Sequence, residues 1–157
     1  YAGKNKERIL AIMHDSHLGA MGAMGLIGIL LLKFALLGNI SFPVLWKSLL
    51  IMCVLGRWAQ VLACYVSDYA RETGKGKSFT EDVGRRELLI SSLFSLALSL
   101  FLLGFRAVIL FGILTPTLLY FIKYLKKRIG GMTGDTIGAV NEVAEITVLL
   151  SMVILVR

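Results

Sequence analysis

The sequence predicts an all-α, polytopic membrane helix bundle with about five transmembrane helices. Of its 157 residues, 57% are hydrophobic, and its mean hydropathy is +0.78. An ordinary soluble domain has roughly 45–50% apolar residues. The excess lies in five apolar segments, each near the ~20 residues that cross a bilayer. The length allows one such bundle, so we expect residues 1–157 to form a single integral-membrane domain in contact with lipid.

The five helices are expected in chain order, separated by polar or glycine-rich links. The first carries a glycine at every third position, and small residues let helices approach closely in lipid. The third, which is the shortest, and the fourth form a hairpin through Gly104 and Phe105. The fifth follows a glycine-rich turn. They are expected at about residues 18–37, 44–65, 88–103, 107–124 and 136–156.

Basic residues are concentrated in alternate links, which predicts the orientation. The amino-terminal arm, the long loop after the second helix and the link after the fourth helix are rich in Lys and Arg. Such segments stay on the cytoplasmic side. The chain is therefore expected to be a multi-pass protein of the cell inner membrane with its active face in the cytoplasm. The opposite face is expected to carry Lys33, Lys47, Arg106 and Arg157.

The net charge of +7 also comes from the basic residues in these links. In a soluble protein it would suggest nucleic acid as a partner. Here the basic residues flank apolar segments, and they lack the interleaved aromatic residues of single-strand binders. We therefore expect no nucleic-acid partner, and the sequence leaves an oligomer open.

Acidic residues mark one face of the fifth helix. Asp135, Gly138, Glu142 and Glu145 are spaced by three, four and three residues, so they share that face. Carboxylates in a membrane span are costly without a partner. Asp135, or a threonine beside it, could simply cap the helix, and the glutamates could pair with a neighbouring helix, for example through Arg57. The alternative is a catalytic site in which Asp135 and Glu142 bind Mg²⁺, which takes one or two carboxylates plus phosphate oxygens.

Arg57 is the clearest charge inside the second predicted helix. It continues toward the cytoplasm as a polar stripe with Gln60, Cys64 and Asp68. An arginine at this depth must be paired or face water. Its guanidinium suits either a carboxylate or a phosphate, so structural pairing and anion binding both remain open.

Two further segments are candidates for ligand binding. The loop with Arg71, Gly74 and Gly76 could cradle an anion, although a solvated loop has the same composition. Asp15 precedes the first helix, where it could cap the helix or contribute to a site. The nearby histidines, three positions apart with no cysteine close by, are a poor zinc signature.

Three blocks of the chain together resemble the cobalamin synthase family, the adenosylcobinamide-GDP ribazoletransferases. In order, the blocks read KERILAIMHDSHLGAMG, VLGRWAQVLACYVSDYARETGKGKSF and GGMTGDTIGAVNEVAE. The resemblance covers nearly the whole chain, and the three blocks in this order are much more specific than any one of them.

The resemblance implies a Mg²⁺-dependent membrane transferase of cobalamin biosynthesis. Such an enzyme joins adenosylcobinamide-GDP to α-ribazole or its 5′-phosphate, giving adenosylcobalamin or its phosphate, and releases GMP. Matched positions imply catalytic roles for Asp135, Glu142 and Glu145. They imply substrate-binding roles for Asp15, Arg57, Arg71, Gly74 and Gly76.

The chain also departs from the family pattern. His14 and His17 stand where basic residues are expected beside Asp15. The family carries an aspartate-rich, metal-binding element, which would fall just before Tyr1. We therefore expect this chain to be a carboxy-terminal portion, lacking upstream helices and that element, and to be inactive alone.

Other functions remain as alternatives. A transporter or channel component could use Arg57 and the glutamates as an intramembrane ion relay, although the charges are expected near one face. A CDP-alcohol-type phosphotransferase would release CMP instead of GMP. A structural partner subunit would need no chemistry.

Overall fold

Five long helices make up the computed structural model. The structure describes residues 9–10, 12–13, 17, 19–67 and 83–156. The helices are α2 (Ala20–Gly38), α3 (Phe42–Val66), α5 (Arg85–Leu103), α6 (Arg106–Ile129) and α7 (Gly134–Leu155).

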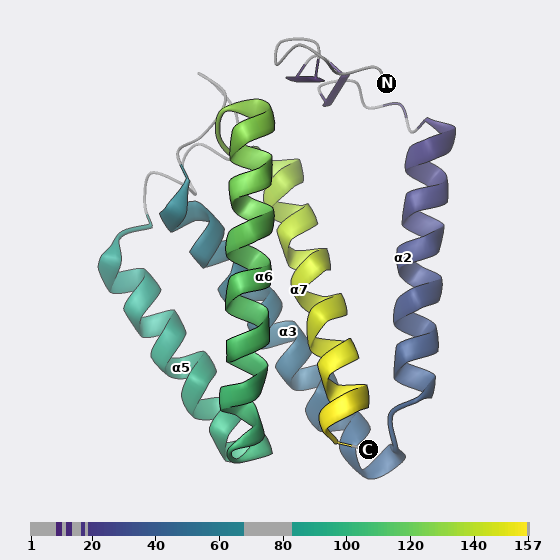
Figure 1. The fold of residues 1–157 in the computed structure, drawn as a ribbon, viewed down its shortest axis with the longest axis vertical. Helices are drawn as coiled ribbons and strands as arrows, with labels where there is room; N and C mark the ends of the chain where they lie inside the picture. The colour runs from purple at the N-terminus through teal and green to yellow at the C-terminus, as the bar shows by residue number, and fades with distance from the viewer. Residues whose placement is uncertain (1–8, 11, 14–16, 18, 68–82, 157) are drawn as a thin grey trace.

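All five helices are long and apolar enough to cross a membrane, with mean hydropathies between 1.7 and 2.1 over their best windows. The chain is thus an all-α, multi-pass membrane protein, as the sequence predicts. Successive helices run in opposite directions, so the start of α5, the end of α6 and the start of α7 share one end of the bundle (Figure 1).

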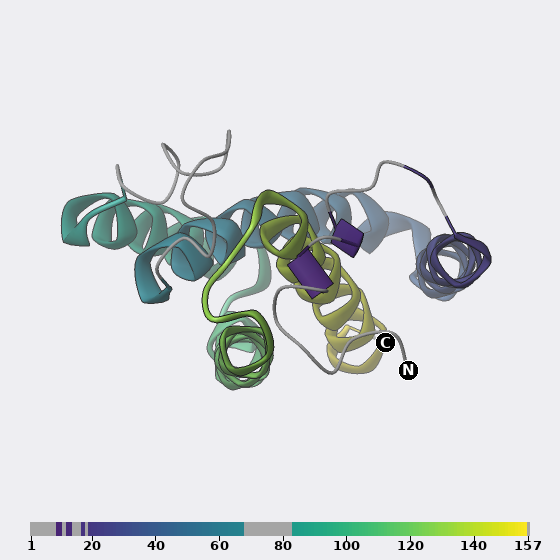
Figure 2. The ribbon, with the colours of Figure 1, turned by 90° about the horizontal axis from the view of Figure 1, so that it is seen from above.

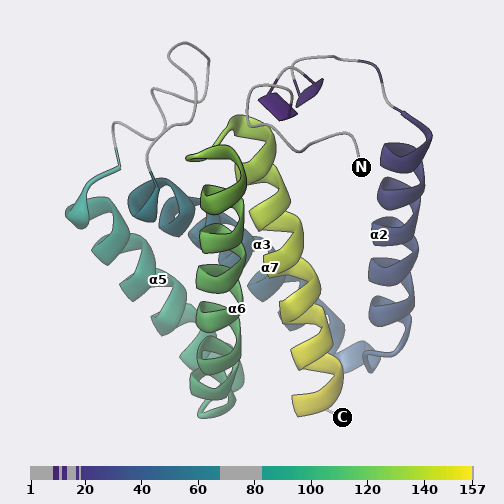
Figure 3. The same ribbon diagram turned by 45° about the horizontal axis from the view of Figure 1, so that its top comes forward.

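The core of the bundle is formed by α3, α6 and α7. Figure 1 shows α3 crossing behind α6 and α7, with α5 on one outer side and α2 on the other, and Figure 3 shows the same order from a tilted view. α3 packs mainly against α7 and α5, and α6 packs against α7. The fully buried side chains of this core include Ile51, Leu55, Leu110, Leu114, Leu118, Ile122, Val140 and Val148.

A polar contact and an aromatic contact fix α5 and α6 to α3. The indole Nε1 of Trp58 donates a hydrogen bond to the Ser92 hydroxyl at 2.9 Å. The ring of Trp58 also packs against Phe111, with ring centroids 5.2 Å apart. An indole N–H inside a membrane protein needs an acceptor of this kind.

A tight turn joins α6 to α7 and sets where the acidic helix begins. Gly130 adopts a left-handed conformation (φ 79°), and its N–H bonds the carbonyl of Lys126, which ends α6. Thr133 then caps α7: its side chain accepts from the backbone N–H of Thr136, and its own N–H donates to the Thr136 hydroxyl at 2.7 Å. Of the two caps that the sequence left open, a threonine is correct and Asp135 is wrong, because Asp135 lies in the first turn.

α2 stands apart from the rest of the bundle. The view from above places it at one edge, beyond α3 and α7 (Figure 2). In this helix, which the structure describes in full, only Leu36 is buried, and residues such as Met21 and Phe34 are about 80% exposed. Apolar surface of this kind faces lipid without cost, so α2 gains little from packing alone.

Candidate functional site

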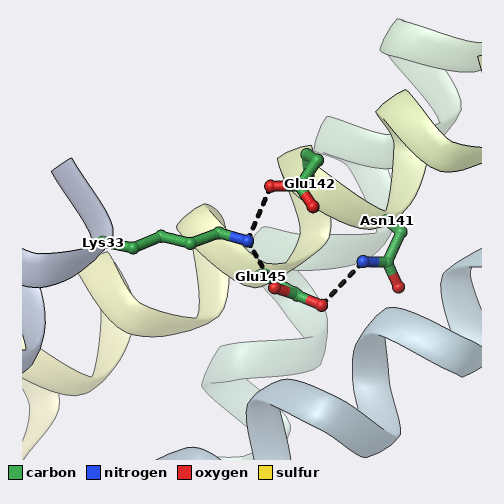
Figure 4. Close-up of polar contacts among 4 residues, drawn as sticks. All are labelled: Lys33, Asn141, Glu142 and Glu145. Atoms are coloured by element: carbon green, nitrogen blue, oxygen red, sulfur yellow. Dashed lines mark hydrogen bonds and ion pairs between the residues drawn. The ribbon is translucent and has the colours of Figure 1, made fainter. Parts of the chain in front are cut away.

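Three charged side chains meet between α2 and α7. The Lys33 ammonium of α2 lies 2.6 Å from Glu142 Oε2 and 2.5 Å from Glu145 Oε2, both on α7 (Figure 4). The side chains of Lys33 and Glu145 are each 16% exposed, and that of Glu142 is 40% exposed. Glu145 stands midway along α7, so this charge cluster (Lys33, Glu142 and Glu145) lies inside the membrane-spanning part of the bundle.

Asn141 and Gly56 both affect how Glu145 is held: Asn141 binds it, and Gly56 leaves space for this contact. Asn141 Nδ2 donates to Glu145 Oε1 at 2.6 Å, so both carboxylate oxygens of Glu145 are bonded (Figure 4). Gly56 of α3 leaves the room that this needs: a Cβ built there would lie 2.7 Å from Asn141 Oδ1 and 3.3 Å from Glu145 Oε1. α7 can therefore approach α3 at this level only because residue 56 has no side chain.

The ion pairs explain how the carboxylates are tolerated in the membrane. An isolated charge at this depth is expensive, and pairing is the usual remedy. With one ammonium and two carboxylates, the charge cluster carries a net charge of −1. Asn141 extends the cluster toward Gly56 of α3, since a Cβ at residue 56 would meet its Oδ1.

Arg57 does not pair with the glutamates, contrary to the example considered from the sequence; Lys33 takes that position. The guanidinium of Arg57 is exposed and donates to Gln60 Oε1 at 3.2 Å. It also borders a largely apolar cavity of about 340 Å³ between α3 and α5. The cavity is lined by Cys53, Val54, Arg57, Trp58, Val61, Ser91, Phe94 and Ser95.

Asp135 is exposed in the first turn of α7, away from the charge cluster. It is seven positions from Glu142, which is about 10 Å along a helix axis. In the described part of the chain, no three His, Cys, Asp or Glu side chains come together as a metal site. Asp135 has no hydrogen-bond or ion-pair partner among those residues and could bind Mg²⁺, whereas Glu142 and Glu145 are already paired with Lys33.

Several residues singled out in the sequence lie outside the described residues. These are Asp15, Arg71, Gly74 and Gly76, together with His14 and Asp68.

Sequence reasoning missed Lys33 and Asn141. Lys33 was assigned to the face opposite the acidic residues, yet it reaches them at mid-helix. A signal was present, since a lysine inside an otherwise apolar segment needs a partner. The spacing along the chain could not identify that partner, because 112 positions separate Lys33 from Glu145.

A methyl group at position 56 is expected to destabilise the α3–α7 contact. Gly56→Ala would bring its Cβ to 2.7 Å from Asn141 Oδ1, and overpacking of this kind costs about 1–3 kcal/mol. The matched control is Gly112→Ala in α6, where a Cβ meets nothing within 4 Å. Thermal unfolding in detergent should show a lower Tm for Gly56→Ala and an unchanged or higher Tm for the control. Equal Tm values would contradict the close approach.

Comparison with known proteins agrees with the resemblance. The family model described as cobalamin-5-phosphate synthase matches residues 1–153. No solved structure matches the chain.

Curated relatives match over almost the whole chain. Proteins named adenosylcobinamide-GDP ribazoletransferase from Thermoanaerobacter pseudethanolicus and Alkaliphilus metalliredigens are 39% and 37% identical to it, over 98% and 99% of its length. A protein of the same name from Desulforamulus reducens is 35% identical over 95% of the chain. The chain spans about three-fifths of these relatives, with 60–62% of their lengths covered.

Proposed function

The chain belongs to the cobalamin-5-phosphate synthase family, and from this premise we propose that it is part of an adenosylcobinamide-GDP ribazoletransferase. The proposed substrates are adenosylcobinamide-GDP and α-ribazole or its 5′-phosphate. The products are adenosylcobalamin, or its phosphate, and GMP. The observation that carries the proposal is the family match over residues 1–153, in a chain whose five helices all suit a membrane.

The proposed reaction is a single phosphoryl transfer. A ribose hydroxyl of the ribazole other than the 5′-hydroxyl, which is phosphorylated in the 5′-phosphate substrate, attacks the phosphorus attached to cobinamide. The bond from that phosphorus to the bridging oxygen breaks, GMP leaves with the bridging oxygen, and the hydroxyl proton is released. No covalent enzyme intermediate is needed. Catalysis of such a reaction depends on positioning and on stabilising the charge that develops on the phosphoryl oxygens.

We assign the contact with a substrate phosphate to Arg57. Its guanidinium has no carboxylate partner among the described residues, and an arginine inside a membrane span calls for an anion or water. The apolar cavity beside it offers room for the uncharged part of a substrate, since ligand sites are mostly apolar with a few polar groups. The loop with Arg71, Gly74 and Gly76, and Asp15, are proposed as further substrate contacts on the strength of the family motifs.

Glu142 and Glu145 are proposed as the acidic part of the catalytic site. Their carboxylates are held in one arrangement by Lys33 and Asn141, which is the preorganisation that charge stabilisation requires. The active face is proposed to be the end of the bundle at which α7 begins, on the cytoplasmic side of the inner membrane.

Mg²⁺ is the proposed cofactor, and Asp135 is the described residue that best fits it. The ion would neutralise charge on the diphosphate and its leaving group. Mg²⁺ keeps several waters and needs only one or two carboxylates besides phosphate oxygens. The exposed carboxylate of Asp135 suits that role. Glu142, which is paired with Lys33, would contribute at most through water.

Asp135→Asn is therefore expected to weaken metal binding. The change removes a charge and keeps the size, so the Mg²⁺ concentration for half-maximal transfer should rise at least about tenfold. Binding of Mn²⁺, followed by electron paramagnetic resonance, gives a second readout that needs no turnover. Glu87→Gln, at an exposed first turn of α5, is the control. Unchanged Mn²⁺ affinity in Asp135→Asn would remove Asp135 from the metal site.

The family match favours this function over the alternatives. The position of the charge cluster midway through the membrane keeps a relay chemically conceivable, yet the matched relatives are named as transferases. The direct test uses the full-length protein in lipid nanodiscs, supplied with adenosylcobinamide-GDP, α-ribazole and Mg²⁺. We expect GMP and a corrinoid product in equal amounts. CMP release from a CDP-alcohol, or substrate flux without GMP, would contradict the proposal.

A further inference from the structure

α2 depends on polar contacts to stay on the bundle. Its apolar residues face outward, and Leu36 alone is buried along its described length. In lipid, apolar contact does little to drive helices together, so interhelical polar contacts carry more of the association. Lys33 provides such contacts, because its ammonium bridges two carboxylates of α7.

The same lysine also fixes the glutamates. Glu142 and Glu145 are three positions apart on one helix face, where two uncompensated carboxylates repel each other. Lys33 sits within 2.6 Å of both and binds one oxygen of each. The second oxygen of Glu145 is held by Asn141. Among the described residues, Lys33 is thus the cation that balances and orients both acids.

We propose that Lys33 is a positioning residue for the transfer reaction: it docks α2 on α7 and thereby holds Glu142 and Glu145 in their working arrangement. This inference rests on the proposed function, in which the two glutamates form the acidic part of the catalytic site. Lys33 acts through them and needs no contact with substrate.

The first test measures docking without turnover. Spin labels at Met24→Cys in α2 and Tyr120→Cys in α6, both exposed, report the distance between α2 and the bundle by pulsed electron resonance. The background replaces Cys53 and Cys64 with serine and alanine. We expect one narrow distance with Lys33 or Lys33→Arg, and a distribution broadened or lengthened by at least about 5 Å in Lys33→Met. Lys47→Met is the matched control, since Lys47 lies over the Trp46 ring rather than on a carboxylate.

The second test measures transfer by the same variants. We expect Lys33→Met to lower kcat about 100-fold, Lys33→Arg to recover at least a tenth of the native rate, and Lys47→Met to stay within threefold of it. An unchanged distance or an unchanged rate in Lys33→Met would overturn the proposal. If the unsubstituted protein releases no GMP, the proposed function fails, while the distance measurement still decides whether Lys33 docks α2.

Exchanging the two charges distinguishes positioning of the glutamates from docking of α2 on α7. It also avoids an unbalanced charge, which could prevent folding. Lys33→Glu combined with Glu142→Lys keeps one ammonium and two carboxylates between the same helices. We expect the narrow distance to return while the rate stays at least 30-fold below native, because α7 has lost a carboxylate. Recovery of the rate to within threefold of native would overturn the positioning role.

Discussion

Arg57→Met is expected to lower kcat/KM for transfer about 100- to 1,000-fold, the loss typical of removing one group that stabilises transition-state charge. The reason is that the Arg57 guanidinium is exposed beside an apolar cavity and, among the described residues, is held by Gln60. Methionine keeps the apolar length of the side chain and removes the charge. The measurement is GMP release by the full-length protein in nanodiscs.

Stability should change little in this variant, which separates it from a folding defect. The Arg57 side chain is exposed and has no ion pair with a described residue, so its loss leaves no buried charge behind. Arg57→Lys should recover only part of the activity, because an ammonium cannot bind phosphate bidentately. Arg106→Met, an exposed arginine at the start of α6, is the matched control. Activity of Arg57→Met within threefold of the control would exclude a phosphate contact.

Glu145→Leu is expected to produce the largest loss of stability, together with a loss of transfer. The change leaves Asn141 Nδ2 without its acceptor and removes one of the two carboxylates that bind Lys33. Leaving the buried Asn141 donor unsatisfied costs about 1–3 kcal/mol, and the loss of one of the two ion pairs of Lys33 adds to this cost. The free energy of unfolding in detergent measures the loss of stability, and GMP release measures the loss of transfer.

Glu142→Leu provides the comparison within the same charge cluster. The Glu142 side chain is 40% exposed, and its partner among the described residues is Lys33. An ion pair this exposed contributes about 1 kcal/mol or less. We therefore expect Glu142→Leu to retain most of the stability while still losing transfer. Equal stability losses in the two variants would contradict the unequal burial of the two glutamates.

The helices themselves could be predicted closely, because the length of an apolar segment determines where a span begins and ends. The main difference is at the end of α6, which continues beyond residue 124 to Ile129. Lys126, Lys127 and Arg128 are good helix formers, and the helix stops only where Gly130 adopts a left-handed conformation. Charge therefore marked the end of the apolar segment and not the end of the helix.

The site was predicted less completely, because spacing within one helix does not determine its neighbours. The shared face of Glu142 and Glu145 follows from a three-residue step, and one lysine indeed binds both. The choice of Arg57 as an example of a partner was wrong, because Lys33 of α2 takes that position. On α3, Gly56 is the residue whose Cβ position faces Glu145, and the next residue is rotated by about 100° around the helix, toward α5.

A shared helix face also does not show that two residues are close along the helix axis. Asp135 was grouped with Glu142 because both positions share a face, and the structure keeps them about 10 Å apart along the axis. Asp135 lies in the exposed first turn, where a carboxylate also interacts favourably with the helix dipole. Its assignment to Mg²⁺ therefore stays a prediction that the metal-binding experiment addresses.

The most direct test of the transferase account follows the two phosphorus atoms of the substrate. Adenosylcobinamide-GDP labelled on the phosphorus next to cobinamide, or on the one next to guanosine, is incubated with α-ribazole and the full-length protein in nanodiscs. We predict that the first label stays entirely in the corrinoid product and that the second leaves entirely as GMP. Release of the first label as GDP, or retention of the second label in the corrinoid, would contradict attack at the cobinamide-linked phosphorus.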